Sequence, residues 1–347
     1  MSDIKSIDKN FDIVTKINKT DIKFHNARSA PFRIYGVFYE DGKLRRMPET
    51  VAKTVSTGVY YLHANTAGGR VRFKTNSPYV AINTRMAGIT HMDHFPLCGT
   101  AGFDLYADGE YIKTFRPPYD MTDGYESLIE LGSARMREIT INMPLYSDVC
   151  ELYIGLAENA EILAPTPYRV EKPVVFYGSS ITQGGCASRP GTSYQAFITR
   201  WLDVNHVNLG FSGNAKGEEE MADYIASLDM SAFVCDYDYN TPNAEHLAAT
   251  HERLFNKVRA AHPDMPIVIV TRPKPHYSEG EDLDCFEVAR RTYEHALAAG
   301  DRNVRFIDGR TLLGEAGLEG TVDALHPTDL GFYAMAKRIS KELGKLV

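Results

Sequence analysis

The first half of the chain shows a pattern of short apolar runs. From about Phe32 to Leu163, runs rich in β-branched and aromatic residues are separated by Gly, Asn, Asp and Pro, which is typical of strands joined by tight turns. The runs lie at 59–64, 70–75, 79–86, 103–116, 138–144 and 150–156. They predict an antiparallel β-sandwich, because such strands bury an apolar face when two sheets pack together.

Two local signals refine this prediction. Asp108-Gly109 lies between two strand-like runs and is a dipeptide favoured in two-residue hairpin turns. Polar and apolar residues alternate over 70–74, which predicts a strand with one face in the core and the other in water.

The pattern changes after the proline-bearing stretch 164–167, where strand-length apolar runs begin to alternate with helix-length segments. We expect strands near 173–178, 205–210, 232–238, 266–271 and 304–308, and helices near 193–203, 216–228, 243–261, 284–299 and 329–344. This alternation predicts right-handed βαβ units and a parallel sheet between two helical layers. We therefore expect two domains, a β-sandwich over 1–165 and an α/β domain over 166–347.

Polar and small residues follow the predicted parallel strands, at the edge where such sheets bind ligands. Ser179 and Ser180 follow the first strand, in a turn that can hold a nucleophile beside backbone N–H groups. Gly213 follows the second strand, and without a Cβ its amide can turn toward the same crevice. Asn240 follows the third strand, where its side chain either donates to an oxyanion or caps the next helix.

A carboxylate and an imidazole lie three residues apart near the C-terminus. Asp323 precedes His326, and Pro327 disfavours a helix at this point. On a loop, the carboxylate can accept from one ring nitrogen while the other nitrogen faces the crevice. Each of these short patterns is common by chance, and their specificity lies in the conjunction of four elements in this order along the chain.

This set of motifs resembles the SGNH hydrolases, also called GDSL esterases, over roughly 170–347. Segments 178–191 and 208–214 are similar to one branch of that superfamily, in which a β-rich domain with a Gly-Xaa-Asp-Leu-Tyr signature precedes the catalytic domain. Residues 102–106, Gly-Phe-Asp-Leu-Tyr, match the signature. The resemblance implies a three-layer, flavodoxin-like SGNH domain after a jelly-roll-like β-sandwich.

The resemblance also implies a role for each motif residue. Ser180 would be the nucleophile, His326 the general base and Asp323 its orienting partner. The oxyanion donors would be the N–H groups of Ser180 and Gly213 together with the side chain of Asn240.

The sequence departs from the family pattern at two points. Ser179 replaces the Asp of the Gly-Asp-Ser motif, so which serine is the nucleophile needs a test. The third block reads Asp-Tyr-Asp-Tyr-Asn over 236–240 instead of Gly-Xaa-Asn-Asp, so Asn240 is assigned by context and Asn243 is the next candidate.

Segments expected beside the site indicate the kind of ester. Residues 183–190 and 272–277 are small, polar or basic, which suits a short acyl group on a polar alcohol better than a long chain. The preceding β-rich domain is similar to the arrangement in carbohydrate O-acetyl esterases, which implies an acetylated oligosaccharide or another small acyl ester as substrate. The alternatives are a short-chain lipase or thioesterase, and a catalytically idle protein that binds glycans.

A long loop in the β-rich half, 88–100, carries His91 and His94. Their spacing would suit a metal, but no third ligand is evident, so we expect both histidines, together with Arg189, to bind substrate by hydrogen bonds. We expect no metal and no organic cofactor, because the proposed chemistry requires none and no metalloprotease or phosphate-loop motif occurs.

The composition limits the class of protein, its partners and its cellular compartment. The 347 residues include 44% hydrophobic and 24% charged residues, the balance of a soluble globular protein. The net charge of −7, without a Lys/Arg cluster, argues against nucleic-acid or anionic-membrane partners. Five cysteines without a Cys-Xaa-Xaa-Cys pair favour a reducing compartment, and the first 20 residues lack the apolar core of a signal peptide. We expect a cytoplasmic enzyme whose oligomeric state the sequence leaves open.

Overall fold

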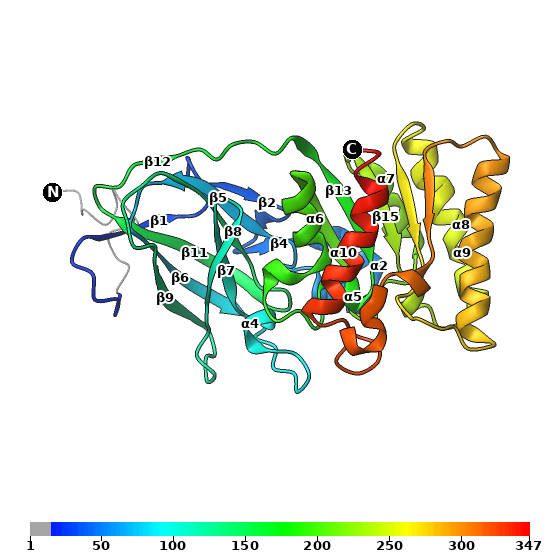
Figure 1. Ribbon diagram of the computed structural model, residues 1–347, viewed down its shortest axis with the longest axis horizontal. Coiled ribbons are helices and arrows are strands. Elements are labelled where there is room, and N and C mark those ends of the chain that lie inside the picture. The colour runs from blue at the N-terminus through cyan, green and yellow to red at the C-terminus, as the bar shows by residue number, and fades with distance from the viewer. Residues whose placement is uncertain (1–14) are drawn as a thin grey trace.

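Two antiparallel sheets form the N-terminal half of the computed structural model, which describes residues 15–347 (Figure 1). One sheet has the strand order β1-β11-β6-β9, and the other has the order β12-β5-β10-β7-β8 with β2 paired to β5. Residues 1–14, which include the start of the predicted first domain and much of the segment used to argue against a signal peptide, lie outside the described residues.

The strands of this half are β1 (Ile22–Asn26), β2 (Arg33–Tyr35), β3 (Phe38–Glu40), β4 (Lys43–Arg45), β5 (Arg70–Thr75), β6 (Tyr79–Ala87), β7 (Phe103–Ala107), β8 (Glu110–Phe115), β9 (Gly124–Glu130), β10 (Arg137–Asn142), β11 (Asp148–Ala157) and β12 (Ile162–Leu163). The short helices between them are α2 (Glu49–Val55), α3 (Thr57–Leu62) and α4 (Leu97–Thr100). Phe73, Ile82, Phe103 and Ile154 lie in one buried cluster between the sheets. The predicted β-sandwich is confirmed. Asp108 and Gly109 have φ values of 52° and 84° between β7 and β8, as a two-residue hairpin turn requires.

A five-stranded parallel sheet forms the C-terminal half, in the order β14-β13-β15-β16-β17. Its strands are β13 (Val170–Gly178), β14 (Val204–Gly210), β15 (Ala232–Asp236), β16 (Ile267–Val270) and β17 (Val304–Ile307). The helices are α5 (Ser180–Gln183), α6 (Tyr194–Leu202), α7 (Glu219–Ser227), α8 (Ala244–Ala261), α9 (Glu281–Ala298) and α10 (Asp329–Leu343), and the 3₁₀ turns are η2 (Pro190–Thr192), η3 (Asp238–Asn240), η4 (Gly309–Thr311) and η5 (Gly314–Gly320).

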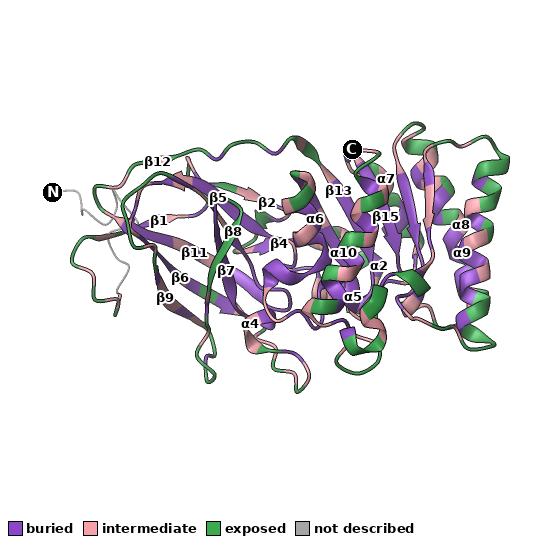
Figure 2. Cartoon of the chain, viewed as in Figure 1, coloured by how far each residue is buried: buried purple, intermediate pink, exposed green. Residues whose placement is uncertain are grey.

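The two faces of the parallel sheet have separate apolar cores. Val174 and Phe176 of β13 pack with α6 and α10, whereas Val175 and Tyr177 of the same strand pack with α7, α8 and α9. Buried residues run through both sheets of the sandwich and through the parallel sheet (Figure 2). The predicted three-layer, flavodoxin-like domain is confirmed, with the 2-1-3-4-5 strand order of that fold.

The prediction of a strand at 59–64 is wrong, because α3 (Thr57–Leu62), which follows closely on α2 (Glu49–Val55), covers most of that range. Ser56 caps α3 by accepting a hydrogen bond from the Val59 amide at 3.2 Å. Val55 and Val59 are buried in the same apolar cluster as helix α7. Burial against the α/β core therefore overrides the strand preference of these β-branched and aromatic residues. In space, this N-terminal segment adds two helices to the α/β half.

The prediction of one wet face on the strand at 70–74 is also wrong. Arg70 and Arg72 of β5 are only 1% and 7% exposed. The α/β half covers Arg70, which donates to the Asn205 side chain at 2.6 Å and to the carbonyl of His206 at 3.3 Å. Arg72 pairs with Glu138 of β10 at 3.2 Å and stacks on Tyr168. Polar and apolar residues do alternate along β5, but its polar face lies at the junction with the α/β half and not in water.

Two further features bear on the predicted setting. The thiols of all five cysteines are free. Within residues 15–347, no helix combines the length and the apolar character needed to span a bilayer.

Candidate active site

The turn after β13 presents Ser180 at the first position of helix α5. A Cβ added to Gly178 would lie 2.1 Å from the Thr182 hydroxyl and 2.2 Å from the Asp236 carbonyl, so the strand can end this tightly only at a glycine. Ser179 caps α5, because its hydroxyl accepts from the Ile181 amide at 3.2 Å. Ser179 therefore acts as the helix cap, whereas Ser180 is the first residue of the helix and its hydroxyl does not cap it.

A chain of hydrogen bonds joins Ser180, His326 and Asp323. The Oγ of Ser180 lies 3.0 Å from Nε2 of His326, and Nδ1 of His326 lies 2.7 Å from Oδ2 of Asp323. The other carboxylate oxygen accepts from the backbone amides of Leu325 at 3.0 Å and His326 at 2.7 Å. Ala324, with φ of 64°, makes the tight turn between the two residues. The structure thus brings together the three residues that the sequence singled out.

The ionisation of Asp323 suits a partner for the imidazole. Burial raises the pKa of the carboxyl, but hydrogen bonds from the ring and backbone of His326 and from the Leu325 amide outweigh it and leave the pKa below its usual value. The carboxylate is therefore charged at neutral pH and can fix the His326 tautomer in which Nδ1 carries the proton.

Gly213 lies in a loop tied to the serine turn. The Phe211 amide donates to the Gly178 carbonyl at 2.9 Å, and the Ser212 amide donates to the Gln183 side chain at 3.0 Å. Gly213 has φ of 70°, in the left-handed region that favours glycine. Within residues 15–347 its N–H has no hydrogen-bond acceptor, so it is available to an oxyanion.

Asn240 ends the 3₁₀ turn η3 and faces the same loop. Its Oδ1 accepts from the Ala215 amide at 3.4 Å, which leaves the Nδ2 group free to donate. The alternative role as a helix cap is taken by Asn243, whose side chain accepts from the His246 amide at the start of α8 at 2.8 Å. The oxyanion roles of Ser180, Gly213 and Asn240 stay predictions that this arrangement supports.

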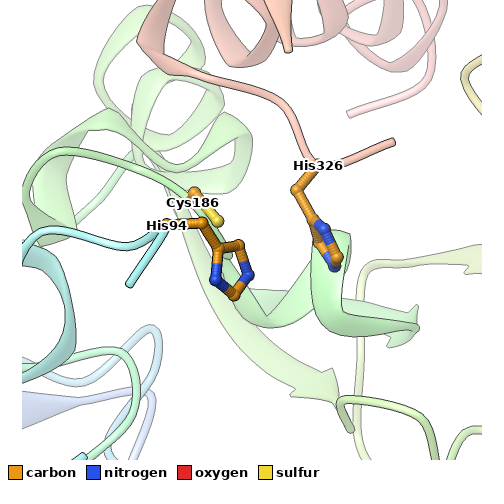
Figure 3. A group of neighbouring side chains, drawn as sticks. All are labelled: His94, Cys186 and His326. Atoms are coloured by element: carbon orange, nitrogen blue, oxygen red, sulfur yellow. The ribbon is translucent and has the colours of Figure 1, made fainter. Parts of the chain in front are cut away.

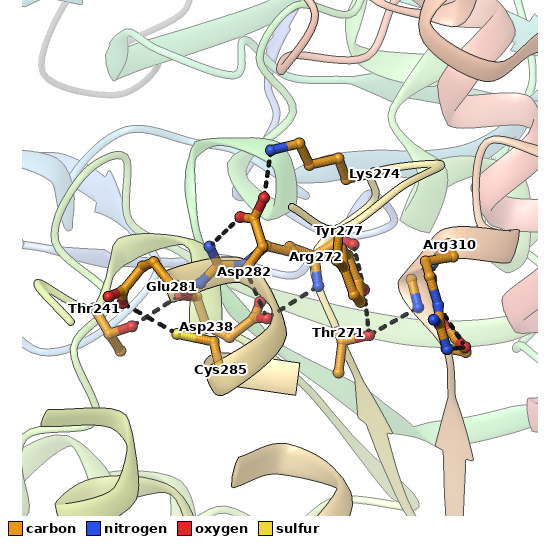
Figure 4. A network of polar contacts seen from close by, with 12 residues as sticks. Asp238, Thr241, Thr271, Arg272, Lys274, Tyr277, Glu281, Asp282, Cys285 and Arg310 are labelled. Carbon is orange, nitrogen blue, oxygen red and sulfur yellow. Dashed lines mark hydrogen bonds and ion pairs between the residues drawn. The ribbon is translucent and has the colours of Figure 1, made fainter. Parts of the chain in front are cut away.

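A buried ionic network holds the turn that carries Asn240 (Figure 4). Arg272 donates through its backbone amide and Nε to Oδ2 of Asp238, at 3.1 and 3.3 Å, and through Nη2 to the Asp238 carbonyl at 2.7 Å. Its Nη1 lies 3.0 Å from Asp282, which also pairs with Lys274 at 2.5 Å. From the sequence, residues 272–277 were predicted only to be a small, polar or basic segment beside the site. The available signal was Arg272 itself, which directly follows the strand predicted at 266–271.

The loop 88–100 brings one of its two histidines to the triad. The His94 and His326 rings lie 5.5 Å apart between centroids, and Cys186 lies beside them (Figure 3). His91 instead packs edge-on against Tyr119 at 5.7 Å, beside a cavity of about 240 Å³. His94 is therefore the better placed of the two to contact a substrate.

The ligand atoms of His94, Cys186 and His326 lie within 4.8 Å of one another, a spacing from which a metal could be held after small shifts. Because Nδ1 of His326 is bonded to Asp323, such a metal would need Nε2, the atom that faces Ser180. Metal binding and the Ser180 hydrogen bond would compete. That catalysis uses no metal and no organic cofactor stays a prediction.

Arg189, the third residue predicted to bind substrate, is engaged by the β-sandwich. Its Nη1 lies 3.1 Å from Asp104 of the Gly-Phe-Asp-Leu-Tyr signature and 2.6 Å from the Tyr106 hydroxyl, and its guanidinium stacks 3.8 Å from the Tyr111 ring. The fully buried Asp104 also accepts from the Gly191 amide at 2.8 Å. The signature thus joins the two halves through Arg189, whose predicted contact with substrate remains untested.

We expect Asn240→Ala to lower kcat by about 10²- to 10³-fold with little change in KM, because the side chain would bond mainly to the charge that develops on the oxyanion. Steady-state kinetics with 4-nitrophenyl acetate measures this. Asn243→Ala is the matched control: it removes a helix cap at a cost of about 1 kcal/mol in stability and should leave kcat unchanged. A larger kcat loss for Asn243→Ala than for Asn240→Ala would contradict the assignment.

Comparisons with known proteins place the chain in a family. Residues 171–344 match the GDSL-like Lipase/Acylhydrolase family, and residues 22–162 match the GxDLY family, described as the N-terminus of Esterase SGNH hydro-type. The chain belongs to the GDSL-like lipase/acylhydrolase family and is a carboxylic ester hydrolase of SGNH type. No functionally curated protein sequence matches it.

Solved structures repeat the two-part architecture. A GDSL-like lipase from Bacteroides ovatus is 28% identical with a TM-score of 0.83, over 94% of this chain and 98% of that one. The salicylyl-acyltransferase SsfX3 from a tetracycline biosynthetic pathway is 21% identical with a TM-score of 0.78, over 94% and 98%. A family two carbohydrate esterase from Clostridium thermocellum, in complex with cellohexaose, is 16% identical with a TM-score of 0.64, over 90% and 98%. The last two show a shared fold.

Proposed function

We propose that the chain removes short acyl groups, above all O-acetyl groups, from carbohydrates through an acyl-enzyme on Ser180. The observation that carries this proposal is the continuous hydrogen-bond chain from Ser180 through His326 to Asp323. It lies at the carboxyl end of β13, the edge where parallel α/β sheets bind their ligands. A protein that only binds glycans would have no need for this alignment.

In the first half-reaction, Nε2 of His326 takes the proton of Ser180 as Oγ attacks the ester carbonyl carbon. The carbonyl electrons move to oxygen, where each well-placed N–H donor contributes about 3 kcal/mol to stabilising the transition state. When the tetrahedral intermediate collapses, the C–O bond to the alcohol breaks and His326 returns the proton to the leaving alcohol. Asp323 holds the imidazolium that forms between these steps.

In the second half-reaction, water replaces the alcohol. His326 takes a proton from the water as it attacks the acyl carbon, and returns that proton to Oγ as the ester bond to Ser180 breaks. The products are the free carboxylic acid and the regenerated serine. Every proton in this cycle is handled by the chain's own side chains.

The preference for an acetylated sugar is supported by two features. His94 and Cys186, which lie beside His326, are polar or small, and residues 183–185 read Gln-Gly-Gly, which suits a short acyl group better than a long one. The fold likeness to a family two carbohydrate esterase supports a saccharide as the alcohol. Import of such oligosaccharides into a cytoplasmic setting remains part of the proposal.

A chain-length series tests the acyl preference. We expect kcat/KM for 4-nitrophenyl esters to fall as the acyl chain grows from two to eight carbons, and acetate to be released from at least one of acetylated mannan, xylan or sialic acid fragments. A rate that rises with chain length would favour the short-chain lipase or thioesterase alternative. No hydrolysis of any ester would favour the glycan-binding alternative.

A second candidate, acyl transfer to an alcohol, is favoured by the likeness to a salicylyl-acyltransferase. The same triad serves both reactions, because only the nucleophile that resolves the acyl-enzyme differs. Turnover of 4-nitrophenyl acetate in the presence of a polyol separates them. A hydrolase releases free acetate as its main product, whereas a transferase yields mainly acetylated polyol.

The β-sandwich is expected to contribute to sugar recognition through His94. We expect His94→Ala to lower kcat/KM about tenfold for an acetylated oligosaccharide, and much less for 4-nitrophenyl acetate, which has no sugar to contact. His91→Ala, which alters the contact with Tyr119 instead, is the matched control and should change neither value. Equal losses on both substrates would mean that His94 acts on His326 and not on the sugar.

A further inference from the structure

A second cavity lies between the two halves of the molecule and shares no lining residue with the Ser180 triad. Its volume is about 590 Å³. Strands β5, β8 and β10 of the sandwich line one side, and α6 with the start of β14 lines the other. We call it the interdomain cavity. Its main polar and aromatic lining residues are Arg70, Arg72, Arg189, Arg200, Tyr111 and Trp201.

Four arginines line the interdomain cavity, and among the described residues only two of them pair with a carboxylate. Arg72 pairs with Glu138 at 3.2 Å and Arg189 with Asp104 at 3.1 Å. Arg70 donates only to neutral groups, and Arg200 lies over the rings of Tyr106 and Phe197 and has no ion-pair partner in residues 15–347.

The two other acidic residues of the lining, Asp203 and Glu110, do not pair with Arg70 or Arg200. Asp203 accepts from the backbone amide of Arg169, and Glu110 is exposed on the hairpin edge. Two guanidinium groups, those of Arg70 and Arg200, therefore line the interdomain cavity without a carboxylate of their own. Burial favours the neutral form of Arg200 and lowers its pKa, so a bound anion would relieve that cost.

Two buried polar atoms in the lining lack hydrogen-bond partners within the described part of the chain. They are Nη1 of Arg72, whose residue is 7% exposed, and Nε2 of His206, whose residue is 2% exposed. Buried polar groups are normally paired, so the guanidinium of Arg72 is short of one hydrogen-bond acceptor. A guanidinium is best satisfied by the two oxygens of a carboxylate or phosphate.

Two large aromatic side chains remain accessible at the same place. Trp201 is 41% exposed and Tyr111 is 43% exposed, and both line the interdomain cavity. Flat aromatic faces combined with convergent polar groups suit a ligand with an apolar face and a hydroxylated rim, which describes a pyranose ring.

We propose that the interdomain cavity is a second, non-catalytic binding site for an anionic sugar, a pyranose unit that carries a carboxylate or a phosphate. Arg200 and Arg72 bind the anionic group, and the exposed parts of the Trp201 and Tyr111 rings contact the sugar. The site does not depend on the esterase proposal, because none of its residues takes part in the acyl transfer. It makes the junction of the two halves a place where an acidic glycan is held.

The single tryptophan of the chain gives a direct readout of this site, since Trp201 lines it. The Ser180→Ala variant is titrated with glucuronic acid, glucose 6-phosphate, glucose and inorganic phosphate at one ionic strength while Trp fluorescence is recorded. We expect saturable changes with glucuronic acid, glucose 6-phosphate or both, and binding at least tenfold weaker for glucose and for phosphate alone. The preferred acidic sugar identifies which anion the site favours.

Arg200→Met in the same background should weaken that binding at least tenfold, whereas Arg291→Met, on the exposed face of α9, should leave it unchanged. Thermal unfolding followed by circular dichroism shows whether each variant is folded. If Arg200→Met is unfolded, Arg72→Gln replaces it, with the same loss expected. The proposal is overturned if no acidic sugar binds, if inorganic phosphate binds as tightly as the acidic sugars, or if the folded variant binds them unchanged.

Discussion

Replacing Ser180 with alanine is expected to lower kcat for 4-nitrophenyl acetate about 10⁶-fold, the scale seen when a triad nucleophile is removed. The reason is geometric: Ser180 Oγ is the hydroxyl that lies 3.0 Å from Nε2 of His326. Without it, no group on the turn after β13 can be deprotonated while facing the ester. Burst and steady-state kinetics measure the loss.

Ser179→Ala is the matched control for this experiment, because it removes a hydroxyl from the adjacent residue. The Ser179 hydroxyl caps helix α5, so its loss should cost about 1 kcal/mol in the free energy of unfolding and leave most of the turnover. Urea denaturation measures the first effect. If Ser179→Ala were inactive and Ser180→Ala active, the nucleophile would be one residue earlier than assigned.

Asp323→Asn is expected to lower kcat about 10⁴-fold while the protein remains folded. An amide at this position can present its NH₂ group to Nδ1 of His326, which favours the tautomer with the proton on Nε2 and removes the base that Ser180 needs. Glu319→Gln, an exposed acid-to-amide change four residues earlier, controls for the loss of one negative charge and should leave kcat unchanged. A loss below tenfold in Asp323→Asn would contradict the role given to this carboxylate.

The charge state of Asp323 adds a pH expectation. Because its pKa in the folded protein lies below the value of about 3.9 for an unperturbed aspartate, the hydrogen bonds that the carboxylate accepts from His326 and Leu325 add stability above that pH. That contribution is lost as the pH falls through the lowered pKa. The unfolding free energy of Asp323→Asn should therefore approach that of the unaltered protein at acidic pH, as denaturant titrations between pH 3 and 7 can measure.

The α/β half could be predicted closely because its strands and helices carry strong local patterns. The ranges expected for the last strand and the last helix agree with β17 and α10 to within one residue at each end. The β-rich half was predicted as a class of fold, but not in the segments that touch the other half. Helices α2 and α3 and the buried Arg70 of β5 owe their state to contacts with residues more than 100 positions away, which no local pattern reports.

In the candidate site too, local motifs could be predicted and contacts between distant segments could not. Ser180, Asp323 and His326 could be singled out because each lies in a short motif with a chemical meaning. The difference between His91 and His94 could not, because it depends on the direction of a loop relative to another domain. Arg272 was missed for a related reason: its partners Asp238 and Asp282 lie 34 and 10 residues away, so the network that holds Asn240 exists only in the folded chain.

The central claim, that Ser180 is acylated during turnover, is tested most directly by an irreversible fluorophosphonate, which phosphonylates an activated serine with loss of fluoride. Intact-mass spectrometry and fragmentation of the peptide that contains both serines locate the adduct. We predict one adduct per chain on Ser180, absent in Ser180→Ala and strongly slowed in His326→Ala. An adduct on Ser179, or none in a preparation that turns over 4-nitrophenyl acetate, would contradict the account.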